Sequence, residues 1–267
     1  EIRPVEGGRY GGMARVATMV DRLRKAHAPV LVTLGGDYLS PSALGTARVD
    51  GSALAGRQMV DVLNHIGVDW ATFGNHEFDV SEAAFRRHLG QVKFPLVSSN
   101  VVAAGGKPFP GVATAAIATV RSGKRRLRIG LIGVTLDATL APWVSYHDVI
   151  ASARERIGEL RGKVDAIVAL THLTLAQDAD FLAALPEIDL VLGAHDHENW
   201  LLRRGPRLSG RRRPVRPSDA GGLPRAIPCY APRGAPGGSP PTAAAGRLTP
   251  IRGTRRRTVA PPGCRCP

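Results

Sequence analysis

Two short polar segments of this 267-residue chain carry side chains that bind metal ions, and each follows an apolar run. Residues 74–79 read Gly-Asn-His-Glu-Phe-Asp, and residues 193–198 read Gly-Ala-His-Asp-His-Glu. Asp37 and His172 each come shortly after a further apolar run. Carboxylate, amide and imidazole ligands without a thiolate suit Mn²⁺, Zn²⁺, Mg²⁺ or Fe. Such ions assist the hydrolysis of phosphate esters by neutralising phosphoryl oxygens and lowering the pKa of a bound water.

The four segments should meet in space because each leaves a predicted strand at its carboxyl end. In an open α/β sheet these ends lie along one edge, where ligands bind. We therefore expect five candidate metal ligands to converge at one sheet edge, although they are far apart in the sequence. They are Asp37, Asn75, His172, His195 and His197.

Each of these residues, taken alone, has an ordinary structural interpretation. Asp37 could cap a loop, an isolated Asn-His pair is typical of a turn, and His172 could be a strand-end histidine. His195 and His197 are harder to explain in this way, because side chains two residues apart in an extended loop point the same way. The occurrence of all of them in this order favours a metal site.

His76 is a candidate catalytic residue together with Asp79, which lies three residues further on. If the chain enters a helical turn there, the carboxylate can hold the imidazole in one orientation and raise its basicity. A histidine held in this way could protonate a departing oxygen or stabilise the charge that develops on it.

The apolar pattern predicts alternating strands and helices. Ser81 is a good N-cap for one of the helices, and two of the strands can pair as a hairpin across Ser122 and Gly123. Strands followed by helices with short links predict an α/β fold, a mainly parallel sheet covered by helices, for which about 200 residues are ample. The expected helices are 12–27, 53–66, 81–89, 149–160 and 175–185, and the expected strands are 30–34, 69–73, 95–98, 112–120, 127–134, 164–170 and 188–192.

The basic charge of the chain belongs to its last part. Residues 201–267 hold 15 of the 36 Lys and Arg but one of the 22 Asp and Glu, so they carry the whole net charge of +14. Arg, Pro, Gly and Ala make up 46 of these 67 residues, a composition that cannot bury enough apolar surface to fold. We expect a disordered tail, either a genuine basic segment or the product of a frameshift in GC-rich DNA. The charge therefore predicts no specific nucleic-acid partner for residues 1–200.

The cysteines and the chain start leave the compartment open. Cys229, Cys264 and Cys266 all lie in the tail, so residues 1–200 contain no disulfide and no thiolate ligand. No apolar stretch is long enough for a membrane span. No signal peptide is present, but the chain starts at Glu1 rather than at Met, so a targeting segment could precede it.

The order of the motifs resembles the calcineurin-like metallophosphoesterase superfamily, and within it the bacterial 5'-nucleotidase and UDP-sugar hydrolase family. The resemblance covers roughly residues 1–200. It rests on the motifs Gly36-Asp37, residues 74–79, Thr171-His172 and residues 193–197, together with the lead-in 10–15 to the first helix. It implies a layered sandwich of mainly parallel mixed sheets flanked by helices. It also implies a monomer in the periplasm or outside the cell.

The resemblance further implies a site with two divalent metal ions and a bridging hydroxide that attacks a nucleotide or nucleotide-sugar phosphate. Asp37 would bridge the two ions, and Asn75 would bind the first of them. His172 and His195 would complete the sphere of that ion, and His197 would bind the second. His76, held by Asp79, would sit opposite the leaving group.

Two departures from the family pattern imply that this chain is impaired. The family carries an Asp-x-His motif on its first strand, which would lie before Glu1, so Asp37 and His197 alone would hold the second ion. The C-terminal substrate domain of the family has no counterpart in the tail. Two alternatives stay open: a related hydrolase acting on a non-nucleotide substrate, such as the thiosulfate-processing members, and a non-catalytic fragment whose basic tail binds anions.

Overall fold

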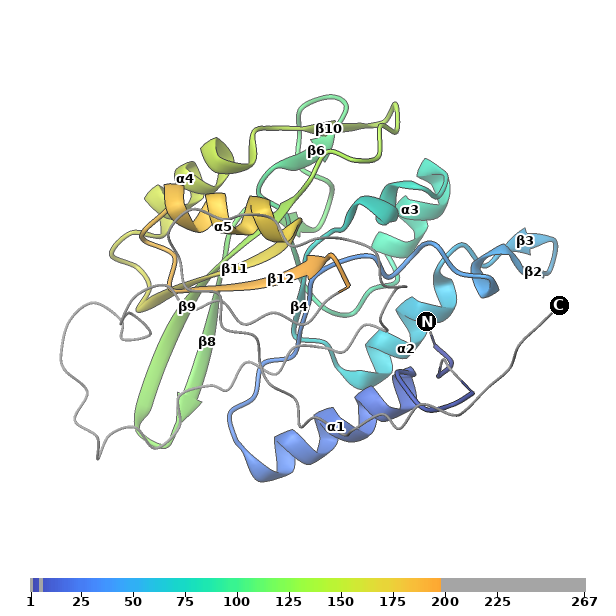
Figure 1. Cartoon of the computed structure of the whole chain (residues 1–267), viewed down its shortest axis with the longest axis horizontal. Helices are drawn as coiled ribbons and strands as arrows, with labels where there is room; N and C mark the ends of the chain where they lie inside the picture. Colours follow the sequence, from blue (N-terminus) through green and yellow to red (C-terminus); the bar gives the residue numbers. More distant parts are fainter. Residues whose placement is uncertain (1, 5–6, 198–267) are drawn as a thin grey trace, which may run out of the picture.

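Two four-stranded sheets organise residues 2–4 and 7–197, the part of the chain that the computed structural model describes (Figure 1). The first sheet has the order β1-β4-β5-β7 and is parallel throughout. The second has the order β12-β11-β9-β8, in which only the β8–β9 pair is antiparallel. The strands are β1 Thr33–Leu34, β4 Trp70–Ala71, β5 Leu96–Val97, β7 Val112–Ala113, β8 Ala116–Ser122, β9 Arg125–Thr135, β11 Ala166–Leu173 and β12 Leu190–His195.

Two short antiparallel ladders complete the strands: β2 Arg48–Val49 with β3 Ser52–Ala53, and β6 Val101–Ala103 with β10 Val144–Tyr146. The helices are α1 Met13–Ala26, α2 Arg57–Ile66, α3 Glu82–Leu89, α4 Val149–Leu160 and α5 Leu175–Ala184, with the short 3₁₀ turns η1 Leu44–Thr46 and η2 Asn75–Phe78. None of the helices in the described ranges combines the length and apolar character needed to cross a membrane.

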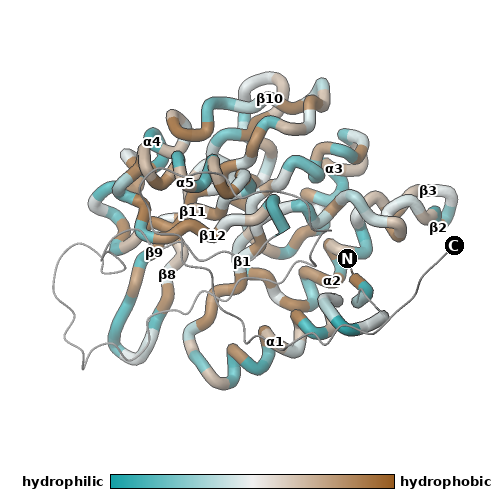
Figure 2. Tube along the Cα trace, viewed as in Figure 1, coloured by the Kyte–Doolittle hydropathy of each residue, from teal (hydrophilic) through white to brown (hydrophobic). Residues whose placement is uncertain are grey.

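Each sheet has its own hydrophobic core, covered by its own helices. Side chains of α2 and α3, such as Leu63 and Phe85, pack with Phe73 and Phe109 over the first sheet. Side chains of α4 and α5 pack with Ile132 and its neighbours over the second sheet. The tube in Figure 2 shows brown, hydrophobic segments gathered along the central strands and teal segments on the outer turns.

Helices α3 and α4 each begin at a residue whose side chain caps the first turn. The side chain of Ser81 accepts the N–H of Ala84 at 3.3 Å and starts α3, as the sequence predicted. Asp148 accepts the N–H of Ala151 at 2.6 Å and starts α4. Such N-caps satisfy one of the otherwise unpaired donors in the first turn of a helix.

The predicted fold class is confirmed: the structure is a mixed α/β fold with mainly parallel sheets flanked by helices. Two details of the prediction are wrong. The expected strand 112–120 divides into β7 in the first sheet and β8 in the second, because the chain crosses between the sheets at residues 114–115. The second wrong detail is the sheet edge: the strand ends that carry the candidate ligands belong to two sheets and not to one. The predicted tail and its cysteines lie outside the described residues.

The two sheets touch at Gly133 in β9, where there is no room for a side chain. A Cβ at this position would collide with the carbonyl of Val97 in β5 and with the hydroxyl of Thr72. The backbone N–H of Ser99 donates to the Gly133 carbonyl at 2.6 Å, and the Thr135 hydroxyl donates to the Phe73 carbonyl at 2.6 Å. These bonds hold β9 against the loops that leave the first sheet.

We predict that Gly133→Ala destabilises the protein, because the added methyl forces the two sheets apart. Overpacking of this kind costs about 1–3 kcal/mol. The matched control is Gly158→Ala in α4, where an added Cβ meets nothing within 4 Å, so the change should stabilise the helix by roughly 0.5–1 kcal/mol. Urea unfolding of both variants measures the difference. Equal unfolding free energies for the two variants would contradict this account of how the sheets pack.

Candidate metal centre

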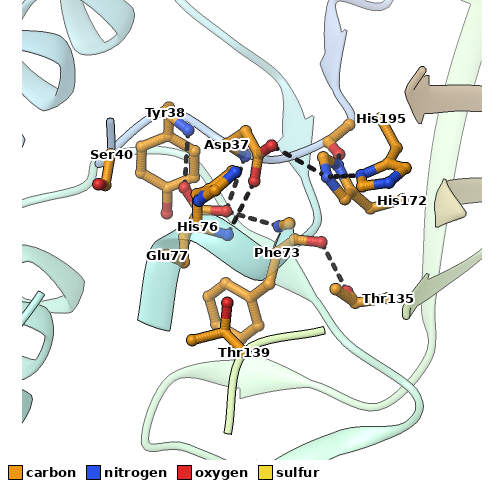
Figure 3. A network of polar contacts seen from close by, with 12 residues as sticks. Asp37, Tyr38, Ser40, Phe73, His76, Glu77, Thr135, Thr139, His172 and His195 are labelled. Atoms are coloured by element: carbon orange, nitrogen blue, oxygen red, sulfur yellow. Dashed lines mark hydrogen bonds and ion pairs between the residues drawn. The ribbon is translucent and has the colours of Figure 1, made fainter. Parts of the chain in front are cut away.

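Four strand ends from the two sheets bring candidate ligands together (Figure 3). Asp37 lies in the turn after β1, and Asn75 opens η2 after β4. His172 lies near the end of β11, and His195 ends the neighbouring strand β12. One ligand atom each from Asp37, His172 and His195 lies within 4.8 Å of the other two. Two ligands on opposite sides of one ion, each bonded at 2.0–2.2 Å, are about 4.4 Å apart, so these residues are close enough to share a cation.

The hydrogen bonds of His172 leave one ring nitrogen for a ligand. Its Nδ1 lies 2.6 Å from the carbonyl oxygen of Gly35, and a carbonyl can only accept, so Nδ1 carries a proton. Its Nε2 lies 3.1 Å from Asp37 Oδ2 and 3.3 Å from His195 Nδ1. At metal sites, the far nitrogen of a ligating histidine usually donates to a backbone carbonyl or a carboxylate, which fixes the orientation of the ring.

Asn75 supplies an independent observation. Its side chain is buried, and its Oδ1 atom has no hydrogen-bond partner among the described residues. Leaving a buried polar oxygen unpaired costs about 1–3 kcal/mol, so a partner is expected. An amide oxygen is a hard ligand of the kind that Mn²⁺, Mg²⁺ and Zn²⁺ accept beside carboxylate and imidazole. The residues present therefore fit a divalent cation.

The backbone at the site adopts conformations that non-glycine residues rarely take. Asp37 has φ 58°, His195 has φ 102° and His197 has φ 53°. Positive φ values at such residues cost free energy and gather at functional sites. Gly74 leaves room for the Asp37 carboxylate and the His172 ring, because a Cβ at residue 74 would collide with both.

His76 and Asp79 form a pair beside the ligands. Because η2 is a 3₁₀ turn with Asp79 at its end, His76 Nδ1 lies 2.5 Å from Asp79 Oδ2. The hydroxyls of Ser40 and Thr139 each lie 3.3 Å from the Asp79 carboxylate and donate to it. The backbone N–H of His76 donates to Asp37 Oδ1 at 3.0 Å. No spacing in the sequence pointed to Ser40 or Thr139, since both come from loops distant in the chain.

His197 is the one candidate ligand among the described histidines and carboxylates that lies outside the group. It is described, exposed and two residues beyond the end of β12, but it is not among the residues whose ligand atoms lie within 4.8 Å of one another. The two imidazoles are near enough for His197 to contribute to the lowered pKa of His195.

Glu77 is the residue whose role the sequence did not indicate. It is fully buried, and its carboxylate accepts the backbone N–H groups of Asp37 at 2.7 Å, Tyr38 at 2.6 Å, Leu39 at 3.1 Å and Gly74 at 2.5 Å. Burial and the Asp37 carboxylate raise the pKa of Glu77, and the backbone donors oppose that rise. One feature of the sequence indicates that Glu77 is buried. It is a charged residue next to the apolar Phe78, in a segment too short to form an exposed helix face.

The electrostatics of the site act differently on its three titratable ligands. Burial alone would raise the pKa of Asp37, but the hydrogen bond and charge of His172 outweigh burial and lower it. The same pairing outweighs burial at His172 and raises its pKa. At His195, burial and then the charge of His172 lower the pKa. Metal binding requires an ionised carboxylate and a neutral imidazole, and these are the forms that the environments of Asp37 and His195 favour at neutral pH.

Part of this chain is similar in sequence to proteins of known name. A 2',3'-cyclic-nucleotide 2'-phosphodiesterase/3'-nucleotidase of Haemophilus influenzae is 28% identical over 209 residues, and a snake venom 5'-nucleotidase of Gloydius brevicauda is 30% identical over 196 residues. Each match covers 70% of this chain and 32% of the relative, so the chain spans about a third of the length of these proteins.

Solved structures and a family model agree with these relatives. The crystal structure of a 5'-nucleotidase precursor from Thermus thermophilus superimposes with a TM-score of 0.63 at 28% identity, covering 79% of this chain and 42% of that one. The model of the calcineurin-like phosphoesterase family matches residues 8–199, which include every candidate ligand described above. The chain therefore belongs to the calcineurin-like phosphoesterase family.

Proposed function

We propose that this chain is a metal-dependent hydrolase of a small phosphate ester, with a nucleotide as the favoured substrate class. The observation that carries the proposal is the convergence of Asp37, His172 and His195 within 4.8 Å, next to the unpartnered Asn75 Oδ1. The His76–Asp79 pair adjoins this group through the hydrogen bond from the His76 backbone to Asp37. The names of the relatives support the nucleotide class.

Asp37, Asn75, His172 and His195 would hold one divalent cation. Asp37 and His197 would hold a second, with Asp37 shared between the two. When bound, such cations neutralise phosphoryl oxygens and provide a nucleophile from water near neutral pH. Because the described residues offer the second cation only two protein ligands, the first position is expected to bind much more tightly.

His76 would act on the leaving group. Its Nδ1 faces Asp79 at 2.5 Å, so the proton on that nitrogen is held and Nε2 is the atom presented to substrate. Asp79, fixed by Ser40 and Thr139, holds the ring in one orientation, so that Nε2 can donate a proton to the departing oxygen. General acids placed in this way contribute roughly 10²- to 10⁴-fold to the rate.

A cleft beside this pair provides space for the rest of a substrate. It has a volume of about 730 Å³ and lies between the loop that includes Ser40 and Thr46 and the start of α3 at Val80 and Ser81. Small-molecule sites are usually clefts of about 300–1,000 Å³. Because Ser40 also donates to Asp79, a group held in the cleft would lie near the catalytic pair.

The first test is a calorimetric titration of the full chain with Mn²⁺, chosen because it prefers oxygen and nitrogen ligands to the thiolates of the three cysteines. We expect one tight site. Asn75→Ala and His195→Ala should each weaken it by more than the roughly 10- to 100-fold that second-shell changes cost. His65→Ala, the same change at an exposed histidine of α2, should leave it unchanged. Equal affinities for His195→Ala and His65→Ala would refute the assigned ligands.

The second test separates metal binding from the reaction. His76→Asn should bind Mn²⁺ like the parent chain but hydrolyse adenosine 5'-monophosphate and bis(p-nitrophenyl) phosphate roughly 10²- to 10⁴-fold more slowly. Stoichiometry and initial rates are measured on the same samples. Loss of Mn²⁺ from His76→Asn with the rate retained would reverse the assigned roles. A parent chain that binds Mn²⁺ tightly but hydrolyses neither ester would overturn the proposed reaction and leave the metal site standing.

The third test concerns Glu77. Glu77→Gln keeps the shape of the side chain but places an NH₂ group against backbone donors, which leaves buried N–H groups unpaired at about 1–3 kcal/mol. We expect lower stability in urea together with weaker Mn²⁺ binding, because the turn that carries Asp37 loses its anchor. Glu82→Gln makes the same chemical change at a half-exposed residue paired with Arg86 and should alter stability by less than about 0.5 kcal/mol. Similar losses for both variants would exclude the anchoring role.

A further inference from the structure

The ladder of β8 and β9 ends in a concentrated patch of positive charge. The segment 121–128 reads Arg-Ser-Gly-Lys-Arg-Arg-Leu-Arg, and we call it the basic hairpin. It carries five cationic side chains, and no Asp or Glu occurs anywhere between residues 83 and 136. Figure 1 shows the hairpin in green at the lower left, extending away from α4 and α5, and Figure 2 shows teal, hydrophilic residues at its end.

The strand register places these charges against one another. Arg121 lies directly opposite Arg126, and Arg128, two residues further along β9, shares their face of the ladder. Like charges in directly opposite positions destabilise a sheet. Arg128 pairs with Asp165 at 3.6 Å, but within the described residues Arg121 and Arg126 have no carboxylate within salt-bridge distance. The fold therefore keeps a repulsive arrangement that an external anion would relieve.

The other face of the hairpin adds apolar surface. Leu127 lies opposite Val120 on the face that also carries Arg125, and Leu127 is 41% exposed. Leu127 lies two residues beyond Arg125, where the ladder reaches the turn. Cationic and apolar side chains side by side on one face suit a surface with an anionic layer over an apolar interior. A free phosphate would make no use of Leu127.

The hairpin lies at the end of β9 opposite the metal centre. Thr135 at the carboxyl end of β9 pairs with His172 of β11, whereas Arg126 is nine residues earlier. At a rise of about 3.3 Å per residue the two ends are roughly 30 Å apart. An anion bound at the hairpin is therefore too distant to be a substrate at the metal centre, and the open edge of the site faces away from it.

We propose that the basic hairpin docks the protein on an anionic lipid membrane. Lys124 at the turn and Arg125 would lie at the headgroup phosphates with Leu127 beside them at the boundary of the acyl chains. Arg121 and Arg126, on the opposite face of the ladder, would add to the attraction within the Debye length of the surface. Each Lys or Arg near an anionic surface strengthens binding roughly fivefold. Docking in this way leaves the metal centre open to soluble substrate. Nucleic acid is the less favoured occupant, because its phosphates would engage the cations but not the exposed leucine.

The test measures binding of the full chain to vesicles of phosphatidylcholine with 30% phosphatidylglycerol. One variant changes Arg121, Lys124, Arg125 and Arg126 to Gln. Its matched control changes Arg211, Arg212, Arg213 and Arg216 to Gln, which removes the same charge from the basic segment 201–267. The hairpin variant should bind at least about 10²-fold more weakly than the parent chain, and the control should lose clearly less. Leu127→Ser should weaken binding at constant charge.

Each other result overturns the proposal. Equal losses for the two four-residue variants would mean that net charge alone attracts the chain, and unchanged binding by the hairpin variant would mean that the hairpin is not the contact. Hairpin-dependent binding to duplex DNA without binding to vesicles would assign the surface to nucleic acid. Thermal unfolding serves as the folding check, since removal of the Arg121–Arg126 repulsion should not lower the melting temperature. No readout depends on hydrolysis, so the result stands apart from the proposed function.

Discussion

The metal centre depends on one buried carboxylate. Glu77 accepts N–H groups from three consecutive residues of the β1 turn and from Gly74 of the β4 turn. A fully buried charge is stable only where it is paired or hydrogen-bonded. If these two turns separated, the Glu77 carboxylate would be either exposed to water or buried without hydrogen-bond partners. Because the β1 turn carries Asp37 and the β4 turn leads into Asn75, the distance between these two candidate ligands follows from the hydrogen bonds of Glu77. The strained φ of Asp37 persists because the same bonds hold its backbone.

The histidine ligands reach Asp37 only if the two sheets, each with its own core, are accurately positioned against one another. The register of β11 and β12 puts Leu173 beside His195, so His172 and His195 come from adjacent strand ends of the second sheet. The second sheet is fixed to the first where β9 passes close to β5 at Gly133. The Nδ1–H of His172 then donates to the Gly35 carbonyl at the end of β1. The close backbone approach at Gly133 and the bonds from Thr135 and His172 to backbone carbonyls thus set the ligand positions across the junction.

The sequence predicted the elements well because their signals are local. Ser81 and the amphipathic patterns of α3 and α4 can be recognised within about a dozen residues, and these helices appear where expected. The strand 112–120 was wrongly predicted as one piece, because the β-forming pattern continues while the chain changes sheets, and sheet membership depends on distant partners. Asp79 could be linked to His76 by spacing along a turn. Ser40 and Thr139, which also hold Asp79, could not, since their contacts join residues about 40 and 60 positions apart.

Strand β9 links the two surfaces on which the proposals rest. Its carboxyl half is buried on both faces and built of apolar residues, whereas its amino end is exposed and basic. A strand buried in this way, and bonded on both sides to β8 and β11, does not bend independently of the core. The basic hairpin and the metal centre therefore keep a fixed separation and opposite directions. Charge at one end cannot tune the carboxylate chemistry at the other, because at roughly 30 Å the separation exceeds the Debye length of about 8 Å at physiological salt. Docking would thus determine the location of the protein and the orientation of its metal centre, and would not change the chemistry of the metal-binding residues.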